Sequence, residues 1–349
     1  MNDLTRQIRT LFITAYSGNK PNAEFCEFVT QMSPSGIILF EENCDDHKRL
    51  KESIEKLNSL TETNLLFAID QEGGRVCRLR GEPAEFESPT SFGEKARNDI
   101  ESALENYTVK LCASLEYMRD LGINFLLGPV CDIKPDNTNS SLNGRTFGTN
   151  VEVISKFVAT TVASARKYDF FTCLKHAPGL GAAFGDPHTT LATSTLDQDS
   201  YANTELIPFQ AGVSAGADAI MTSHFVLSKI DNEPITFSQK IISGLIRPAL
   251  SQTLPFITDD LDMRALDGLC TFEERVVRAF NAGHDLLLTR CVQSTKRGVE
   301  ALERSLDSGE ISPERVKQAV KRVKRFQTPP RNSQLLEVET HSGKSDISS

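Results

Sequence analysis

The sequence contains 349 residues, of which 39% are hydrophobic, so the chain is long enough to bury a large core. Its 38 basic and 47 acidic side chains give a formal net charge of −9, which argues against a nucleic-acid partner because phosphate binding needs a clustered positive excess. The eight cysteines form no CxxC pair and follow no regular spacing, which argues against a zinc motif or a disulfide framework and predicts reduced thiols.

Eight short apolar runs, each typical of a buried strand, are spread along the chain. In order they are 11–14, 36–40, 65–69, 123–127, 172–174, 219–222, 256–258 and 286–288. The stretches between them include segments whose apolar residues recur at intervals of three and four, which predicts helices over 45–60, 99–121, 151–168, 204–215, 238–250 and 272–282. Eight β/α units favour an α/β fold of the (β/α)8 TIM-type barrel, with a single catalytic domain, over a doubly wound sheet.

The composition changes after residue 327 to paired prolines followed by serine, glycine and charged residues. We therefore expect the barrel to span residues 1–327 and residues 328–349 to form a polar, disordered tail. No stretch approaches the roughly 20 apolar residues of a membrane span, and the N-terminus lacks the apolar run of a secretory signal. These features predict a cytoplasmic protein without a membrane partner, and we expect a monomer.

Polar side chains follow five of the predicted strands directly. They are Asp70, then Asp132 with the later Arg145, then Lys175 and His176, then Ser223 and His224, and finally Asp259 and Asp260. In a parallel barrel the C-terminal ends of all strands face one mouth, so these side chains are expected to converge on an active site there. The six histidines include no HxH or HExxH pattern, so neither a metal site nor another cofactor is expected.

The segment after the third strand reads DQEGGRV, residues 70–76. Its two glycines permit a tight turn, and Asp70 can accept hydrogen bonds from a diol. Arg75 or Arg78 can fold back or donate to a ligand, whereas Glu72 beside Arg75 can equally form only a structural ion pair.

The loop 129–148, rich in Asp, Asn, Ser and Gly, is too polar to be packed core. Long ordered loops on a barrel are commonly lids or binding loops. Its Arg145 can clamp ligand oxygens; the alternative is an arginine that only staples the loop.

The stretch FTCLKHAPGLGAAFGDPHTTL, residues 171–191, leads from the fifth strand into a glycine-rich loop. It places Lys175 and His176 at the strand end and His188 two residues after Asp186. A carboxylate next to an imidazole can fix its tautomer and stabilise its protonated form, which is typical of an acid/base group.

The seventh strand ends in the adjacent carboxylates Asp259 and Asp260. Because neighbouring side chains on a strand point to opposite sides, we expect one of them to face the mouth and the other to be a structural acceptor. One inward carboxylate opposite a histidine suits covalent catalysis at the anomeric carbon of a sugar. His224 after the sixth strand lines the pocket or satisfies a hydrogen bond behind it.

Taken together, these motifs resemble the β-N-acetylglucosaminidase branch of the family 3 glycoside hydrolases. The resemblance extends over roughly residues 8–300 and rests on DQEGGRV, NGRTFG (143–148), KHAPGLG (175–181) with DPH (186–188), MTSH (221–224) and TDDLDM (258–263). It implies a retaining exo-β-N-acetylglucosaminidase, a β-N-acetylhexosaminidase activity without a cofactor. The implied substrate is a glycan with terminal β-linked N-acetylglucosamine, such as the anhydromuropeptides of cytosolic peptidoglycan recycling.

The resemblance also implies residue roles. Asp259 matches the family's nucleophile, and His188 matches its acid/base with Asp186 as partner. The remaining matched positions are those that hold the hydroxyls and the N-acetyl group of the sugar: Asp70, Arg78, Arg145, Lys175 and His176.

The sequence departs from the usual family motif KHFPGHGD, because Ala177, Leu180 and Ala182 replace the phenylalanine, the second histidine and the aspartate. Three alternatives stay open. A phosphorylase would pass the glycosyl group to phosphate, which a neutral histidine does not repel. A Schiff-base enzyme of aldolase type would use Lys175, and the altered motif is compatible with a sugar-binding protein of weak activity.

Overall fold

A (β/α)8 barrel is the architecture of the protein in a computed structural model that describes residues 3–134, 140–185 and 191–327. Within these ranges, eight parallel strands form one sheet in the order β11-β9-β7-β6-β3-β2-β1-β12. They are β1 (Phe12–Thr14), β2 (Gly36–Leu39), β3 (Leu66–Ile69), β6 (Phe125–Leu126), β7 (Phe171–Ala177), β9 (Ala219–Thr222), β11 (Phe256–Ile257) and β12 (Leu287–Leu288). A parallel bridge between Ile257 and Leu286 joins the two edge strands. The predicted barrel is confirmed, and each predicted apolar run overlaps one of these strands.

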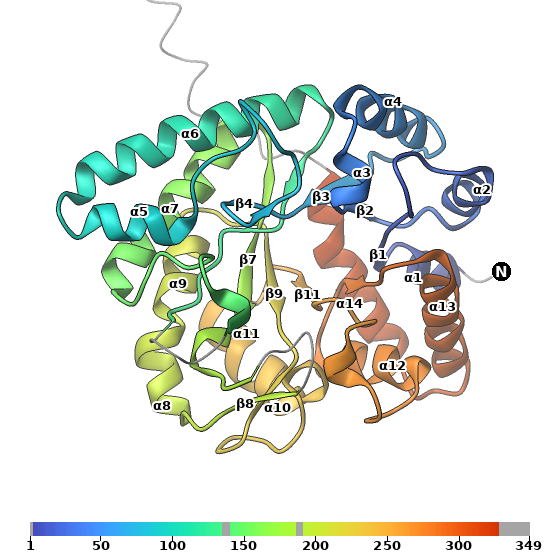
Figure 1. The fold of residues 1–349 in the computed structure, drawn as a ribbon. Helices are drawn as coiled ribbons and strands as arrows, with labels where there is room; N and C mark the ends of the chain where they lie inside the picture. The colour runs from blue at the N-terminus through green and yellow to red at the C-terminus, as the bar shows by residue number, and fades with distance from the viewer. Residues whose placement is uncertain (1–2, 135–139, 186–190, 328–349) are drawn as a thin grey trace, which may run out of the picture.

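Helices surround the strands as a ring (Figure 1). In the described ranges they are α1 (Asp3–Arg9), α2 (Ala23–Met32), α3 (Glu41–Cys44), α4 (His47–Asn58), α5 (Pro89–Ala96), α6 (Ile100–Asp120), α7 (Val151–Lys167), α8 (Gln198–Ser200), α9 (Ile207–Ser214), α10 (Gln239–Ile241), α11 (Arg247–Leu250), α12 (Phe272–Ala282), α13 (Val292–Asp307) and α14 (Pro313–Val323). None of these helices has the length and apolar character needed to cross a bilayer. The six predicted helical stretches are all helical, although the one at 238–250 is divided by the π-helical turn η5 (Ile242–Ile246).

Helix starts follow local capping signals in the sequence. Asp99 accepts a hydrogen bond from the amide of Ser102 and so caps α6, the longest helix of the ring. Thr271 and Glu274 form a reciprocal capping box at the start of α12. Such caps satisfy amide groups that a helix leaves without intrahelical partners, so these chain positions fix where the helices begin.

Several short elements lie at the barrel mouth. They include the antiparallel pair β4 (Gln71–Gly73) and β5 (Val76–Cys77), the parallel pair β8 (Ala192–Ser194) and β10 (Phe225–Leu227), the π-helical turn η3 (Tyr201–Glu205), and the 3-10 turns η1 (Ser140–Leu142), η2 (Leu180–Ala182), η4 (Ile235–Phe237) and η6 (Arg264–Leu266). The 3-10 turn η7 (Lys324–Gln327) lies at the opposite end of the barrel, where Phe326 contacts Phe125 and Phe171 at the starts of β6 and β7. Gly73 and Gly74 connect β4 to β5 with φ angles of 91° and 59°, in the left-handed region that favours glycine. The predicted tight turn after Asp70 is therefore present.

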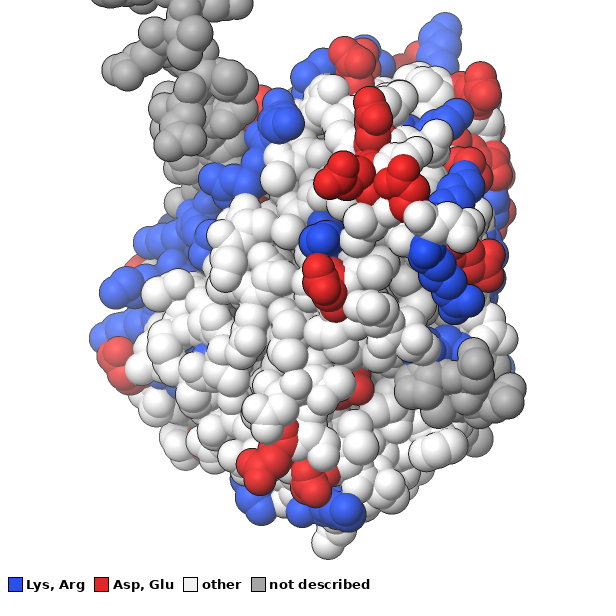
Figure 2. Space-filling view, turned by 90° about the vertical axis from the view of Figure 1, so that its left-hand side faces the viewer, with Lys and Arg blue, Asp and Glu red and all other residues white. Residues whose placement is uncertain are grey.

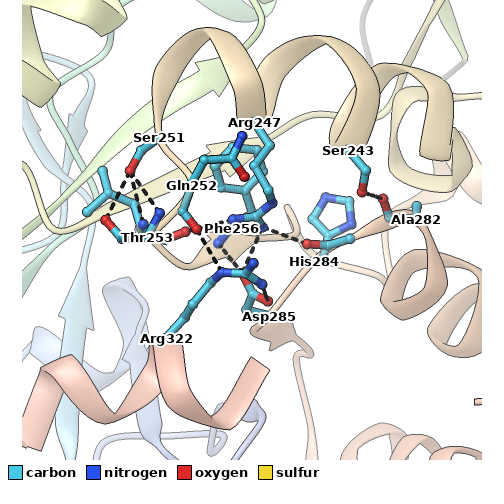
Figure 3. A network of polar contacts seen from close by, with 12 residues as sticks. Ser243, Arg247, Ser251, Gln252, Thr253, Phe256, Ala282, His284, Asp285 and Arg322 are labelled. Atoms are coloured by element: carbon cyan, nitrogen blue, oxygen red, sulfur yellow. Dashed lines mark hydrogen bonds and ion pairs between the residues drawn. The ribbon is translucent and has the colours of Figure 1, made fainter. Parts of the chain in front are cut away.

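A buried charge network fixes the last helix to the barrel (Figure 3). The fully buried carboxylate of Asp285 accepts hydrogen bonds from Arg247 of α11 at 2.8 Å, and from Arg315 and Arg322 of α14 at 3.2 and 3.0 Å. It also accepts the amide of Phe256 in β11 at 3.1 Å. One carboxylate thus links two helices to a barrel strand. The predicted tail, residues 328–349, lies outside the described residues.

Figure 2 shows the side of the molecule on which α5, α7 and α9 lie in Figure 1. Most side chains across the middle of this face are uncharged, and lysine and arginine gather along its left edge. Val109 of α6 and Ile207 of α9 are exposed apolar residues. Single exposed apolar side chains are ordinary surface features, so they do not by themselves mark a binding site.

Candidate active site

A pocket of about 950 Å³ occupies the barrel mouth. Its wall comes from the segments after seven barrel strands, namely β1, β2, β3, β6, β7, β11 and β12, and from Met221 of β9. Six of the predicted site residues line it: Asp70, Arg78, Arg145, Lys175, His176 and Asp259. Two further predicted residues, Asp186 and His188, lie outside the described residues, so the structure does not place them. The expected convergence at the C-terminal ends of the strands is therefore present for the described part of the site.

Five charged side chains form an alternating network at the pocket floor. The Nζ atom of Lys175 lies 2.6 Å from Oδ1 of Asp70 and 2.7 Å from Oε1 of Glu72. Arg145 donates from Nε and Nη2 to the two carboxylate oxygens of Glu72, at 2.8 and 2.7 Å. Arg78 donates to Oδ2 of Asp70 at 3.1 Å. Two carboxylates and three cations thus share one continuous set of contacts.

The protonation states in this network follow from these contacts. Burial opposes the charge on Asp70, yet Lys175 and Arg78 hold its pKa well below its ordinary value. Burial likewise opposes ionisation of Glu72, but Arg145 and Lys175 lower its pKa to about 2. For Lys175, burial would lower the pKa, but Asp70 and Glu72 raise it above its ordinary value. A charged ammonium is a poor Schiff-base nucleophile, so these contacts disfavour the aldolase-type alternative.

The interpretation of Glu72 beside Arg75 as an ion pair is wrong, because Glu72 pairs with Arg145 and Lys175 instead. Arg75 folds away from it: Nε donates to the carbonyl oxygen of Asn143 at 2.6 Å and Nη2 donates to that of Ser141. Arg75 therefore fixes the loop after β6. Arg145 also staples this loop to β4, while it still borders the pocket.

His176 is oriented by a buried carboxylate from the neighbouring strand end. Its Nδ1 lies 2.7 Å from Oδ2 of Asp132, and the same oxygen accepts the His176 amide at 3.3 Å. Oδ1 of Asp132 accepts the amide of Leu180 at 2.6 Å. Asp132 is completely buried, so solvent does not screen its contact with His176. Its position after the predicted fourth strand signalled a functional residue, but the sequence did not reveal this role.

Asp259 and Asp260 both border the pocket. The expectation that only one would do so is wrong, because β11 ends at Ile257 and the alternation of side chains along a strand does not extend to these residues. Oδ1 of Asp259 accepts the amide of Asp260 at 2.8 Å, and Asp259 is only partly buried. Burial, with the neighbouring carboxylates of Asp262 and Asp259, raises the pKa of Asp260 to about 7.

Two further residues, Arg290 and His224, contact Asp260. The guanidinium of Arg290 lies 3.4 Å from its carboxylate and 4.8 Å from the ring centroid of Phe40, and all three residues border the pocket. His224 is completely buried, with Nδ1 2.6 Å from Oγ1 of Thr236 and Nε2 2.9 Å from the carbonyl oxygen of Asp260. These contacts favour a supporting role for His224, and its predicted contact with substrate stays a prediction.

The pocket chemistry suits a polyhydroxylated ligand. Charged donors and acceptors line one side, and the partly exposed carboxylate of Asp259 borders the same cavity. Among the residues that the structure describes, no cluster of three or more His, Cys, Asp or Glu side chains has an arrangement that could hold a metal ion.

Comparison with known families agrees with this geometry. Residues 4–326 match the glycosyl hydrolase family 3 N-terminal domain. The chain belongs to glycosyl hydrolase family 3. The family 3 domain is thus a glycoside hydrolase, and its pocket lies where barrel enzymes bind substrate.

Relatives of the family 3 domain are named β-hexosaminidase or β-N-acetylglucosaminidase. The β-hexosaminidase of Xanthomonas euvesicatoria pv. vesicatoria (strain 85-10) is 26% identical over 302 residues, covering 86% of this chain and 90% of that protein. The β-hexosaminidase A of Pseudoalteromonas piscicida is 27% identical, covering 90% of this chain and 57% of that protein. A solved family 3 β-N-acetylglucosaminidase from Paenibacillus sp. str. FPU-7 is 27% identical with a TM-score of 0.86, covering 94% of this chain and 63% of that chain. The family 3 domain therefore spans about two thirds or less of the last two proteins.

Proposed function

We propose that the family 3 domain is a retaining exo-β-N-acetylglucosaminidase that forms a covalent glycosyl ester on Asp259. The observation that carries this proposal is the place of Asp259: its partly exposed carboxylate borders the same pocket as the Asp70, Lys175 and Arg78 cluster. An amide hydrogen bond from Asp260 orients the carboxylate. A fixed, solvent-accessible carboxylate beside sugar-binding groups is the arrangement that nucleophilic catalysis at an anomeric carbon requires.

The proposed reaction has two steps. In the first, Asp259 attacks the anomeric carbon while His188 donates a proton to the departing glycosidic oxygen, so the glycosidic bond breaks and an ester forms. In the second, His188 removes a proton from water, which attacks the anomeric carbon and releases Asp259 as a carboxylate. Asp186 supports the charge on His188 throughout. Two inversions give net retention of configuration.

The sugar-binding roles follow from the network at the pocket floor. The anionic oxygens of Asp70 accept hydrogen bonds from sugar hydroxyls, while Lys175, Arg78 and His176 donate to hydroxyl and N-acetyl oxygens. Arg145 contacts the sugar from the same side. Because the mutual ion pairs already orient these groups, little side-chain entropy is lost when the sugar binds.

The proposed substrate is a terminal β-linked N-acetylglucosamine unit. The names of the β-hexosaminidase relatives and of the Paenibacillus enzyme support this choice. We place the activity on muropeptides or anhydromuropeptides in cytoplasmic peptidoglycan recycling, by a monomeric enzyme, on the resemblance of the DPH loop and its neighbouring motifs to that branch of the family.

The test is hydrolysis of p-nitrophenyl N-acetyl-β-glucosaminide against p-nitrophenyl β-glucoside, with the configuration of the first-formed sugar followed by NMR. We expect release of the β-anomer from the N-acetylated substrate. Release of the α-anomer, or a preference for glucose, would contradict the proposal. Addition of phosphate distinguishes a phosphorylase, which would release N-acetylglucosamine 1-phosphate. Sugar binding without turnover would instead indicate a binding protein.

A further inference from the structure

Glu205 is a buried carboxylic acid that has no part in the proposed reaction. It is the last residue of η3, where the amide of Leu206 donates to the carbonyl oxygen of Tyr201 at 3.0 Å, five residues back. The residue is 4% exposed, and its Oε2 has no hydrogen-bond partner in the described part of the chain. Single π-helical turns occur often at functional sites, and buried polar atoms are rarely left without partners.

The carboxyl group of Glu205 packs against the turn that follows β7. A Cβ atom on Gly179 would lie 2.6 Å from Oε2 of Glu205 and 2.9 Å from its Cβ. Gly179 has a φ of 125°, and its amide donates to the carbonyl oxygen of His176 at 2.9 Å. The next residue, Leu180, donates its amide to Asp132. Glu205 is therefore in contact with the middle of the turn between His176 and Leu180, whose amides both donate to Asp132.

We infer that Glu205 is a positioning residue: its carboxyl group fixes Gly179 and thereby the arrangement of His176, Asp132 and the Leu180 amide. Sugar binding by His176 depends on this arrangement. The contact is specific because glycine leaves room for the carboxyl group, and any side chain at 179 would displace it. Substrate affinity thus depends on a group that does not touch substrate.

The charge on Glu205 makes this support dependent on pH. Burial, followed by the nearby carboxylate of Asp132, raises the pKa of Glu205 to about 8. Within residues 3–134, 140–185 and 191–327, the titratable groups that face it are Asp132, from the segment after β6, and Tyr201 of its own turn, and neither supplies positive charge. Glu205 is neutral near pH 7. At higher pH an anion forms beside Asp132, and like-charge repulsion shifts the turn.

The test compares the full-length protein with Glu205→Gln, which keeps shape and neutrality, and with Glu205→Ala. The KM for p-nitrophenyl N-acetyl-β-glucosaminide is measured at several pH values together with kcat. Asp260 also titrates in this range, so the two proteins are compared with each other. Between about pH 6.5 and pH 9 we expect the wild-type KM to rise about tenfold more than the KM of Glu205→Gln. Glu205→Ala should raise KM at every pH, with a smaller effect on kcat.

Glu303→Gln is the matched control. Burial also raises the pKa of Glu303, but this residue lies on α13 and pairs with Arg9 at 3.7 Å, away from the pocket. The KM of Glu303→Gln should change with pH as the wild-type KM does. If the KM of Glu205→Gln changes in the same way, the inference is overturned.

A second readout does not depend on the proposed function. Because the folded-state pKa of Glu205 is above its unfolded value of about 4.5, its stabilising effect is complete below that value and is lost as pH rises through about 8. Between about pH 6 and pH 9 the wild-type melting temperature should therefore fall by at least about 2 °C more than that of Glu205→Gln. If the enzyme has no activity on the aryl substrate, the proposed function fails, and parallel melting curves would separately overturn the inference for Glu205.

Discussion

Nδ1 of His176 lies 2.7 Å from Oδ2 of Asp132, a carboxylate that is completely buried and comes from the neighbouring strand end. The same carboxylate accepts the amides of His176 and Leu180. One side chain therefore orients an imidazole at the pocket wall and holds the turn after β7.

Replacing Asp132 with asparagine should impair sugar binding more than chemistry. The amide keeps one oxygen acceptor but loses the charge, so the ring of His176 is less firmly held. We expect KM for the aryl N-acetylglucosaminide to rise at least about tenfold and kcat to change less. Asp197→Asn, at the exposed cap of α8, is the control and should keep both constants. An unchanged KM in Asp132→Asn would show that the contact does not orient a sugar-binding group.

Glu72→Gln should destabilise the protein, because Glu72 is the shared partner of Arg145 and Lys175. Removing one member of a buried ion network leaves the others without compensation, typically at a cost of about 3–5 kcal/mol. Chemical denaturation at pH 7 measures the free energy of unfolding. A loss below about 1 kcal/mol would contradict the network seen here.

The same variant should change the response to acid. The folded-state pKa of Glu72 is about 2, below its ordinary value of 4.5, so its contribution to stability is present above about pH 4.5 and is lost as pH falls towards 2. Between about pH 5 and pH 2.5, Glu72→Gln should therefore lose less stability than the wild type. Thermal unfolding across this range checks the difference, and parallel curves would count against it.

Asp285→Asn should weaken the attachment of α14. Three arginines converge on this carboxylate, and the amide cannot balance their charge. We expect a loss of about 3–5 kcal/mol in the free energy of unfolding. Glu273→Gln, which removes an exposed pair with Arg297, is the matched control and should cost less than about 1 kcal/mol. Equal losses in the two variants would contradict a special role for Asp285.

His188→Ala tests the acid/base assignment, which rests on the sequence motif alone. Glycosides whose leaving group is a sugar or an alkyl alcohol need protonation of the leaving oxygen, whereas p-nitrophenolate leaves without it. We expect first-step rates to fall about 10²–10⁴-fold for poor leaving groups and much less for the aryl substrate. Equal losses for both substrates would mean that another residue protonates the leaving group.

The barrel itself was predictable from sequence because each strand is a short apolar run and six of the eight runs are followed by a predicted amphipathic helix. The same alternation placed Asp70, Lys175 and Asp259 at one mouth, and the structure brings them together. These inferences need only local pattern and the geometry of parallel strands.

Partnerships between side chains were not predictable in the same way. Glu72 was assigned to Arg75, its neighbour in sequence, but its partners are 73 and 103 residues away. Asp285 likewise collects arginines from α11 and α14, which no local pattern connects to it. The orientation of Asp259 and Asp260 was mispredicted because the strand ends earlier than the apolar run.

Azide rescue of Asp259→Gly tests most directly whether Asp259 is the nucleophile. We expect this variant to be folded and inactive on p-nitrophenyl N-acetyl-β-glucosaminide. Azide should fill the space of the lost carboxylate, restore release of nitrophenol and yield the α-glycosyl azide. Activity of Asp259→Gly without azide, or formation of the β-glycosyl azide with it, would contradict the assignment.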